Sequence, residues 1–243
     1  MAAQQQQEEG KDIVVPGDLL DDTGRLRPGF NTYKEGPNIY ALRLGIKQVR
    51  GDTVGVLALS GRYDPQRNDL VIGTVMETGP SIWVMDIRAP SPVTMHVNDV
   101  PWKVDFGETS KFLATGDTVL LKVAFVDEIK KVQLTMKDRA CRKLTGGLTF
   151  EVAPSKVARI IGRGGSMTNT IKAATNTRMF VGQNGRIWLD GEPHDVALAM
   201  AAIKKIEDEA HTSGLTEKVK AFLEEHRASG MSQWKKATLA KEW

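Results

Sequence analysis

The sequence has 243 residues, a length that allows one large domain or two to three small ones. Its 41% hydrophobic and 26% charged residues are typical of a globular protein in water, and no apolar run approaches the roughly 18 residues of a membrane-spanning helix. The net charge of +3 is too small to indicate nucleic acid by itself, the N-terminus lacks a secretory pattern, and the single cysteine, Cys141, excludes an internal disulfide and a cysteine-based zinc site. We therefore expect a cytoplasmic protein that contacts no membrane.

The first part of the chain is polar and then β-like. Residues 1–10 contain a glutamine run and no apolar anchor, which predicts a disordered tail. Residues 11–64 hold short apolar runs separated by glycine turns, without a helical period, and predict a small N-terminal β-domain. The Pro16-Gly17 pair marks a turn after the first of these runs.

Residues 65–143 predict a barrel. Five partly alternating apolar runs are separated by turns, at residues 70–76, 82–87, 93–97, 119–126 and 131–136. Five strands with this spacing fit an OB-type barrel, a fold that closes its sheet edges and often carries oligonucleotides on one face. The same barrel would also serve as a spacer, so the pattern alone leaves its role open.

Residues 147–212 follow a different pattern, which is strand, helix, helix, strand, strand, helix. Ser166 is placed to cap the second helix, and Asn184-Gly185 is a strong turn signal between the two later strands. Residues 213–243 add an amphipathic helix from 215 to about 227 and a tail. The predicted fold class is multidomain, mainly β with an α+β part.

One segment carries only positive charge. No Asp or Glu lies between Val152 and Leu189, whereas six cations do: Lys156, Arg159, Arg163, Lys172, Arg178 and Arg186. A purely cationic segment in a nearly balanced chain is typical of a local phosphate-binding face. A solvated basic surface has the same composition, so the motif inside the segment has to decide.

That motif is the glycine loop Gly162-Arg163-Gly164-Gly165, followed by Ser166. It lacks the lysine of a nucleotide-hydrolase phosphate loop and the third glycine and preceding strand of a dinucleotide fingerprint. A glycine turn between two short helices fits instead. Glycines let the main chain approach a sugar-phosphate backbone, the N–H groups of the following helix favour an anion, and Arg163 adds a charge. A turn that needs glycine for steric reasons alone remains the alternative.

The segment Val157-Ala158-Arg159-Ile160-Ile161-Gly162-Arg163-Gly164-Gly165-Ser166, followed by Ile171, resembles a KH domain, and the order of elements is similar to the type I topology of that family. KH domains clamp about four nucleotides of a single strand with this loop. The resemblance implies RNA contacts at Arg159, Ile161, Gly162, Arg163, Gly164, Gly165, Ser166, Lys172 and Arg178.

The barrel resembles the RNA-binding repeat of ribosomal protein S-one, on Gly73-Thr74-Val75, Trp83-Val84, the run from Met95 to Val100, and Val132 to Lys137. The resemblance implies that Trp83 and His96 lie on a nucleic-acid face with Lys131 and Asp127 near it. No second aromatic stands at the family's position around Gly79-Pro80. A position in the barrel core is the alternative for Trp83.

The order of the domains along the chain indicates a particular family of RNA-binding proteins. The segment Val14-Val15-Pro16-Gly17-Asp18-Leu19-Leu20 before the barrel, then barrel, then one KH domain, is similar to the KH-containing cap subunit of the archaeal exosome, in the ribosomal-RNA-processing protein four family. This resemblance implies that three cap subunits, which can be mixed with another cap protein, sit on a hexameric ring of RNase PH-like subunits. It implies that they bind single-stranded RNA and guide its 3′ end into the ring for 3′-to-5′ degradation or processing. Val15, Pro16, Gly17 and Asp18 are candidate ring contacts.

The sequence offers no catalytic constellation. Its four histidines are scattered, its adjacent carboxylate pairs are typical of solvated charges, and no nucleophile stands beside a base. We expect no enzyme activity, no metal and no cofactor. Two alternatives remain: a transcription or ribosome-associated RNA factor without a nuclease ring, and a structural cap that serves ring assembly.

Overall fold

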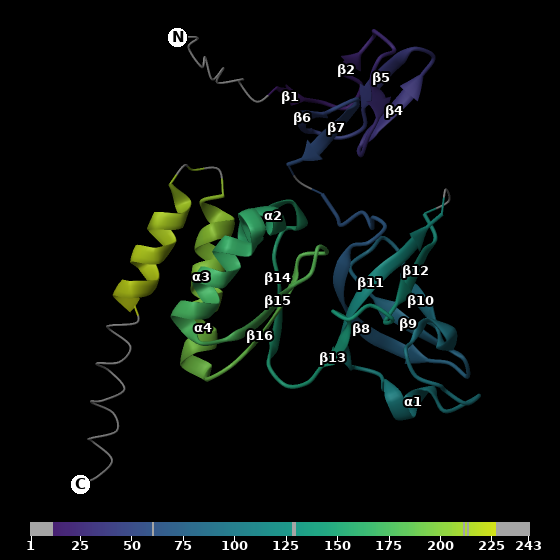
Figure 1. Cartoon of the computed structure of the whole chain (residues 1–243), viewed down its shortest axis with the longest axis vertical. Coiled ribbons are helices and arrows are strands. Elements are labelled where there is room, and N and C mark those ends of the chain that lie inside the picture. Colours follow the sequence, from purple (N-terminus) through teal and green to yellow (C-terminus); the bar gives the residue numbers. More distant parts are fainter. Residues whose placement is uncertain (1–11, 60, 128–129, 211, 213, 227–243) are drawn as a thin grey trace. The chain divides into compact units, whose positions relative to one another are not determined.

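The computed structural model describes residues 12–59, 61–127, 130–210, 212 and 214–226. The predicted disordered tail at 1–10 and the predicted tail after 226 lie outside these residues. The chain divides into two compact units, residues 1–61 and 62–243, and Figure 1 labels most of their elements. No helix of the described residues is long and apolar enough to cross a membrane.

Unit 1 is built from two small sheets. One has the strand order β1-β6-β7-β3 and the other β2-β5-β4. The strands are β1 (Ile13–Val14), β2 (Leu19–Asp21), β3 (Arg27–Pro28), β4 (Thr32–Glu35), β5 (Asn38–Ala41), β6 (Gly45–Arg50) and β7 (Thr53–Ala58). Only a small core is buried, made of Val14, Leu20, Ile39, Ala41, Val54 and Val56. The short strands follow from short apolar runs that glycine turns interrupt.

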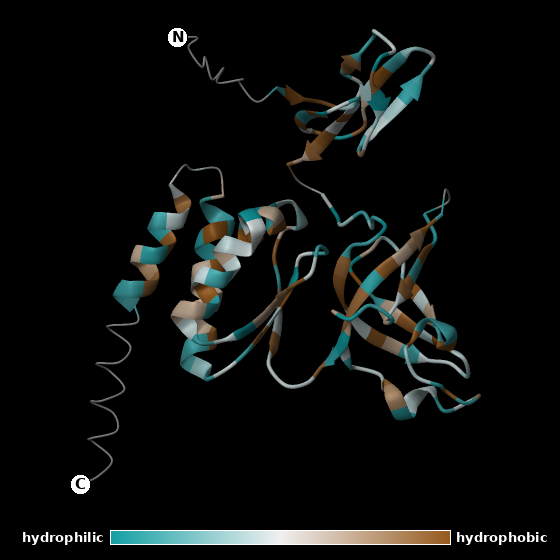
Figure 2. Cartoon of the chain, viewed as in Figure 1, coloured by the Kyte–Doolittle hydropathy of each residue, from teal (hydrophilic) through white to brown (hydrophobic). Residues whose placement is uncertain are grey.

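Unit 2 begins with a closed five-stranded barrel, as predicted. Its strands are β8 (Leu70–Thr78), β9 (Ile82–Asp86), β10 (Val93–His96), β11 (Thr118–Val126) and β12 (Val132–Thr135). The sheet runs in the order β12-β10-β9-β8-β11, and the pairing of β11 with β12 closes it. Hydrophobic and hydrophilic residues alternate along these strands (Figure 2), because one face of each strand packs into the barrel core.

Three short elements decorate the barrel. The connection between β10 and β11 holds η1 (Val97–Asp99) and α1 (Thr109–Phe112), and β13 (Arg142–Leu144) pairs with the start of β11. The sequence pattern did not predict β13 as a strand, because its residues are mostly charged and only Leu144 is buried. This strand carries the chain from the barrel to the α+β part.

The α+β part has the predicted order of elements. They are β14 (Leu148–Glu151), η2 (Pro154–Lys156), α2 (Val157–Ile161), η3 (Arg163–Gly165), α3 (Ser166–Thr175), β15 (Arg178–Val181), β16 (Arg186–Asp190) and α4 (Pro193–Asp208). The sheet order is β14-β16-β15, and the helices cover one of its faces (Figure 1). Residues 215–226 form the predicted further helix, whose Leu215, Val219 and Leu223 join the same core.

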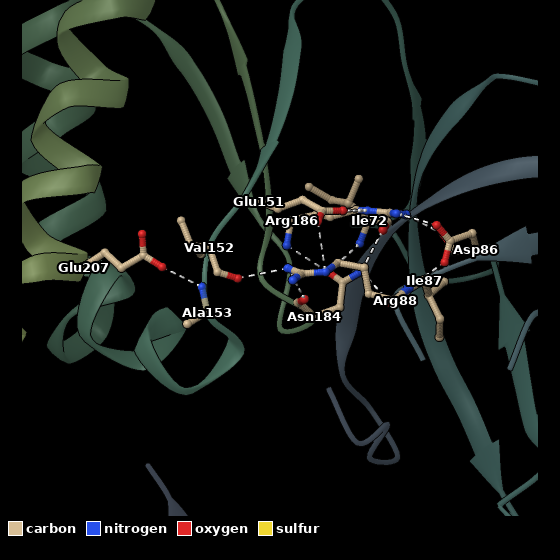
Figure 3. Close-up of polar contacts among 10 residues, drawn as sticks. All are labelled: Ile72, Asp86, Ile87, Arg88, Glu151, Val152, Ala153, Asn184, Arg186 and Glu207. Atoms are coloured by element: carbon tan, nitrogen blue, oxygen red, sulfur yellow. Dashed lines mark hydrogen bonds and ion pairs between the residues drawn. The ribbon is translucent and has the colours of Figure 1, made fainter. Parts of the chain in front are cut away.

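The turn between β15 and β16 joins the α+β part to the barrel. Asn184 is fully buried there, and its side chain accepts a hydrogen bond from Ile72 N at 3.3 Å and donates to Ile72 O at 2.8 Å and Ile87 O at 2.9 Å (Figure 3). The backbone of Gln183 also donates to Leu70 O at 2.8 Å. The turn signal of the sequence was correct, but this turn residue serves as a docking group.

Two arginines surround this contact. Arg186, only 8% exposed, pairs with Asp86 of β9 and with Glu151 of β14 at 3.1 Å. Arg88 pairs with Glu151 at 3.3 Å and donates to Val152 O at 2.9 Å. Burial raises the pKa of Asp86, but the hydrogen bonds from Arg186 and Arg88 lower it more, so this carboxylate stays charged well into the acidic range. The network bridges both domains of unit 2.

An apolar contact lies beside the polar one. Ile72 and Leu120 of the barrel, Leu144 of β13 and Trp188 of β16 form one buried cluster, against which Phe180 packs. On the other side of β14, Glu207 of α4 accepts a hydrogen bond from Ala153 N at 2.8 Å and holds the entry to α2 (Figure 3). Barrel, sheet and helices therefore form one connected body.

We expect Asn184→Ala to destabilise unit 2 by about 3 kcal/mol, because it leaves three buried backbone groups without partners. Urea denaturation of the full chain, followed by tryptophan fluorescence, measures the loss. Gln183→Ala is the matched control, since this neighbouring side chain is exposed and its removal should change stability by less than about 0.5 kcal/mol. Equal stability of the two variants would contradict the docking role.

Candidate nucleic-acid interface

The glycine loop joins α2 to α3 in a conformation that needs glycine. Gly162, Gly164 and Gly165 have φ values of 73°, 57° and 80°. At Gly162 a Cβ atom would lie 2.8 Å from Met167 N, so no side chain fits there. At Gly164 a Cβ would meet open space. The steric interpretation thus holds for Gly162, while Gly164 offers an uncovered stretch of main chain.

The loop presents donors and one cation to solvent. Arg163 and Gly164 are exposed, and the Arg163 guanidinium makes no ion pair with any described residue. The predicted cap is wrong in detail, because Gly165 is the N-cap residue of α3, Ser166 is its first residue, and no side chain caps the helix. The Ser166 N–H donates to Arg163 O within the loop, and no side chain caps the remaining N–H groups of the first turn of α3.

The other predicted loop contacts are spread more widely. Ile161 is half-buried at the end of α2, and Arg159 is exposed but donates to Thr212 O at 2.8 Å. Lys172 lies on α3, six residues after Ser166, and Arg178 lies on β15 in an ion pair with Asp190. The structure therefore gathers Ile161 to Ser166 in one place, and Lys172 and Arg178 in another.

One cation of the basic segment does not belong to an RNA face. Arg186 is buried among Asp86, Glu151 and the backbone of β9. Its charge is neutralised within the domain junction, so it is not available to phosphates. Sequence composition could not reveal this pairing. Asp86 lies far outside the segment that lacks acidic residues, and Glu151 lies directly before it.

A cleft of about 350 Å³ opens on the barrel. It is lined by Ile82, Thr94, His96, Asp99, Phe125, Asp127, Lys131, Val132 and Gln133. The predicted residues His96 and Lys131 thus share one cleft with Asp127. His96 Nδ1 accepts a hydrogen bond from Asn98 N at 3.1 Å, which leaves the Nε2 side of the exposed ring for a ligand.

Trp83 is not part of this cleft, which corrects its predicted place on the nucleic-acid face. Its side chain is 0% exposed, and its Nε1 donates to Leu113 O at 3.1 Å and Thr109 O at 3.3 Å. A base cannot stack on a ring that the barrel core covers on both sides. The alternative interpretation of Trp83 as a core residue is the correct one.

The aromatic residue of the cleft is Phe125, which the sequence analysis missed. Strict alternation along β11 would point Phe125 inward with Leu121 and Val123, which are both buried. The pairing of β11 with β12 shifts register between Val123 and Phe125, and this bulge turns the ring outward to 51% exposure. A bulge is a tertiary feature that the period of the sequence does not reveal.

Among the residues that the structure describes, no group of three or more His, Cys, Asp or Glu side chains is placed to hold an ion. The exposed groups of the glycine loop and the barrel cleft are backbone N–H groups, cations and one aromatic ring. Such groups bind an anionic, unpaired polymer.

Comparison with known proteins agrees with this geometry. The model of the KH domain family matches residues 147–205. The chain is 44% identical over 218 residues to the exosome complex component Rrp4 of Methanosarcina barkeri, covering 90% of this chain and 84% of the relative. It is 44% identical over 218 residues to that of Thermoplasma volcanium, covering 89% and 92%.

A solved structure is similar as well. It is the crystal structure of a candidate exosome complex RNA-binding protein, 35% identical, with a TM-score of 0.62, and the match covers 69% of this chain and 98% of that one. Likeness at this level over nearly the whole length, with the loop and the barrel in place, leads to one conclusion: the chain belongs to the Rrp4 family of exosome complex components.

Proposed function

We propose that this chain is a non-catalytic RNA-binding cap subunit of an exosome, which binds single-stranded RNA and guides its 3′ end into an RNase PH-like ring for 3′-to-5′ degradation or processing. The observation that carries the proposal is the exposed glycine loop at the start of α3, in a body that also holds the barrel cleft. The names of the relatives, exosome complex component Rrp4, support the assembly.

The loop acts on the RNA backbone. A phosphate at Gly164 meets main chain without a Cβ, the positive end of the α3 dipole and the Arg163 guanidinium. None of these groups reads a base edge, so the loop holds the strand and does not choose its sequence. Arg159, Ile161 and Ser166 border the same place and stay in the proposed contact set.

The barrel cleft adds a second contact of another kind. Phe125 offers a half-exposed ring for stacking, and His96 and Lys131 offer donors beside it. Because loop and cleft belong to one connected body, a strand bound at one site is held at high local concentration near the other. Two weak sites then act as one stronger site without any chemistry.

Unit 1 has a surface suited to a protein partner. Large hydrophobic side chains are exposed across it, namely Ile13, Val15, Leu19, Phe30, Tyr33, Leu42, Leu44, Val49, Leu57 and Leu59. Exposed apolar surface of this extent indicates an interaction site. Val15-Pro16-Gly17-Asp18 forms a tight turn there, in which the Asp18 carboxylate accepts from Val15 N at 2.7 Å and Val15 stays exposed. These residues remain the proposed ring contacts.

The finer parts of the proposal rest on the family alone. They are the RNase PH-like identity of the ring, three copies of the chain in each complex, and mixing with another cap protein. The cytoplasmic location expected from the sequence also stays a prediction, as does the absence of enzyme activity.

For the loop, we expect Arg163→Asp combined with Gly164→Asp to weaken single-stranded RNA binding by about tenfold or more, since a hydrogen bond to a charged group contributes roughly 1.5–3 kcal/mol. Fluorescence anisotropy with labelled RNA measures it. Gly164→Asn separates shape from charge, because Asn tolerates the same left-handed backbone and adds a side chain without charge, so it should lose only the part of the affinity that depends on the missing Cβ. Unchanged affinity of the assembled complex would refute the use of the loop.

For the cleft, we expect Phe125→Ala to cost about 1–3 kcal/mol of RNA-binding free energy through one lost stacking contact. The same anisotropy titration reports the change. Phe106→Ala removes an equal ring that is 83% exposed and does not line the cleft, so it should leave the affinity unchanged. A loss of affinity from both variants alike would argue against a specific platform at Phe125.

For the ring, we expect Val15→Asp combined with Leu19→Asp to reduce co-purification of RNase PH-like subunits, because two charges replace side chains that are each 50% exposed. Lys103→Asp in unit 2 is the control for added negative charge, since its side chain is 89% exposed. If the unchanged protein carries no such partners from its native host, the chain is an RNA factor without a ring. If the partners are retained while the RNA-binding variants change nothing, the chain is a structural cap.

A further inference from the structure

A second cleft, which is rich in basic residues, lies where the end of the barrel meets the α+β part. Its volume is about 320 Å³. The residues that line it come from β13 and the turn after it, from α3, from the residue before β15, and from β15 and β16. Four of them are cations: Arg142, Lys143, Lys172 and Arg178. The KH resemblance implied RNA contacts at Lys172 and Arg178, and the sequence analysis gave Arg142 and Lys143 no function.

Two of these cations converge on one aromatic ring. The Arg142 guanidinium lies 5.2 Å from the centroid of Phe180, and Lys172 Nζ lies 5.9 Å from the same centroid. Each cation gains from the face of the ring, but two like charges held over one ring also repel each other. An anion between them removes the repulsion and gains from both charges.

The carboxylates near the cleft are already engaged. Lys143 pairs with Asp117 at 2.6 Å, and Arg178 pairs with Asp190. Neither Arg142 nor Lys172 has a carboxylate partner among the described residues. The cleft therefore keeps an excess of two positive charges, and they are the two charges that share Phe180.

The walls of the cleft are held in place before any ligand arrives. Phe180 packs on Trp188 with ring centroids 5.6 Å apart, and Trp188 is only 3% exposed. Trp188 Nε1 donates to Gly146 O at 2.9 Å, which fixes the turn after β13 against the sheet. At Gly147 a Cβ would lie 2.4 Å from Leu189 O, so this turn approaches the sheet as closely as glycine allows. A site that is built in advance loses little entropy on binding.

The cleft and the glycine loop are connected by one helix. α3 begins at the loop with Ser166 and carries Lys172 six residues later, about 9 Å along the helix axis. A nucleic-acid strand that leaves the loop along α3 reaches Lys172 within a few nucleotides, since a KH loop itself spans about four. This connection favours a nucleic acid over an acidic protein segment, because a nucleic acid carries phosphates for both the loop and the cleft.

We propose that this cleft binds a phosphate of the same single-stranded RNA, held between Arg142 and Lys172 above Phe180. The proposal rests on the proposed RNA-binding function and extends it, because the barrel then contributes Arg142 to the RNA path of the α+β part. The planar guanidinium suits two phosphate oxygens at once, whereas Lys172 acts as a point charge.

The test compares Arg142→Glu combined with Lys172→Glu with the unchanged full-length chain, using labelled RNA of about 12 nucleotides at several salt concentrations. We expect roughly tenfold weaker binding at low salt, and a salt dependence whose slope falls by about 0.7 for the lost phosphate contact. Arg142→Lys should lose less affinity than the double variant, because the charge remains while the two-oxygen contact of the guanidinium is lost. Lys103→Glu controls for a change of overall charge at a side chain that is 89% exposed.

The slope separates a phosphate contact from a structural effect, since a misfolded fraction lowers the amplitude of binding and leaves the slope unchanged. Gly164→Asp separates this proposal from the function it rests on. If Gly164→Asp weakens RNA binding and the cleft variant does not, the cleft proposal is wrong and the loop stands. If the unchanged chain binds no RNA, the proposed function itself fails. If the cleft variant keeps its RNA affinity and slope but loses co-purified protein subunits, the cleft holds an acidic protein segment, which also overturns the proposal.

Discussion

The docking of Asn184 onto the barrel is the contact on which the arrangement of unit 2 depends. Its amide satisfies two carbonyls and one N–H of β8 and the segment after β9, and the Asn184 side chain is fully buried. The charges of Arg88 and Arg186 then lock β14 and β16 to the same region. Without this junction, barrel and helices would be two domains on a tether, and their surfaces would add little to each other. With this junction, the binding surfaces of the barrel and of the α+β part are held in one connected body.

The same junction explains why sequence reasoning succeeded for the elements and failed for some of the side chains. Apolar period, glycine turns and the order of elements are local properties, so the barrel and the α+β part could be predicted from them. The burial of Arg186 is not local, because its partners Asp86 and Glu151 approach only when the domains meet. A cation in a segment without acidic residues looked like a phosphate ligand and proved to be a structural residue.

The aromatic residues show a second limit of the sequence. Trp83 and Phe125 both stand on barrel strands, and resemblance favoured the larger ring for stacking. The fold reverses this choice: Trp83 fills the core and gives its N–H to the α1 segment, while a bulge turns Phe125 outward. Register shifts of one residue decide which face a side chain occupies, and nothing in a single sequence marks where they fall. The glycine loop could be predicted because its constraint is in the backbone, where residue type and conformation are tied.

That backbone constraint has a consequence for which RNAs the protein can serve. Gly162 cannot accept any side chain and Gly164 carries none, so at these two positions the loop has no side-chain atoms with which to distinguish adenine from cytosine. In the proposed function, a receptor made of amides, cations and an aromatic ring would treat most transcripts alike. What it can distinguish is whether a stretch of strand is unpaired. In the proposed function, the secondary structure of a transcript would then decide whether it is bound. A hairpin near the 3′ end would protect the transcript from degradation better than a change of its base sequence.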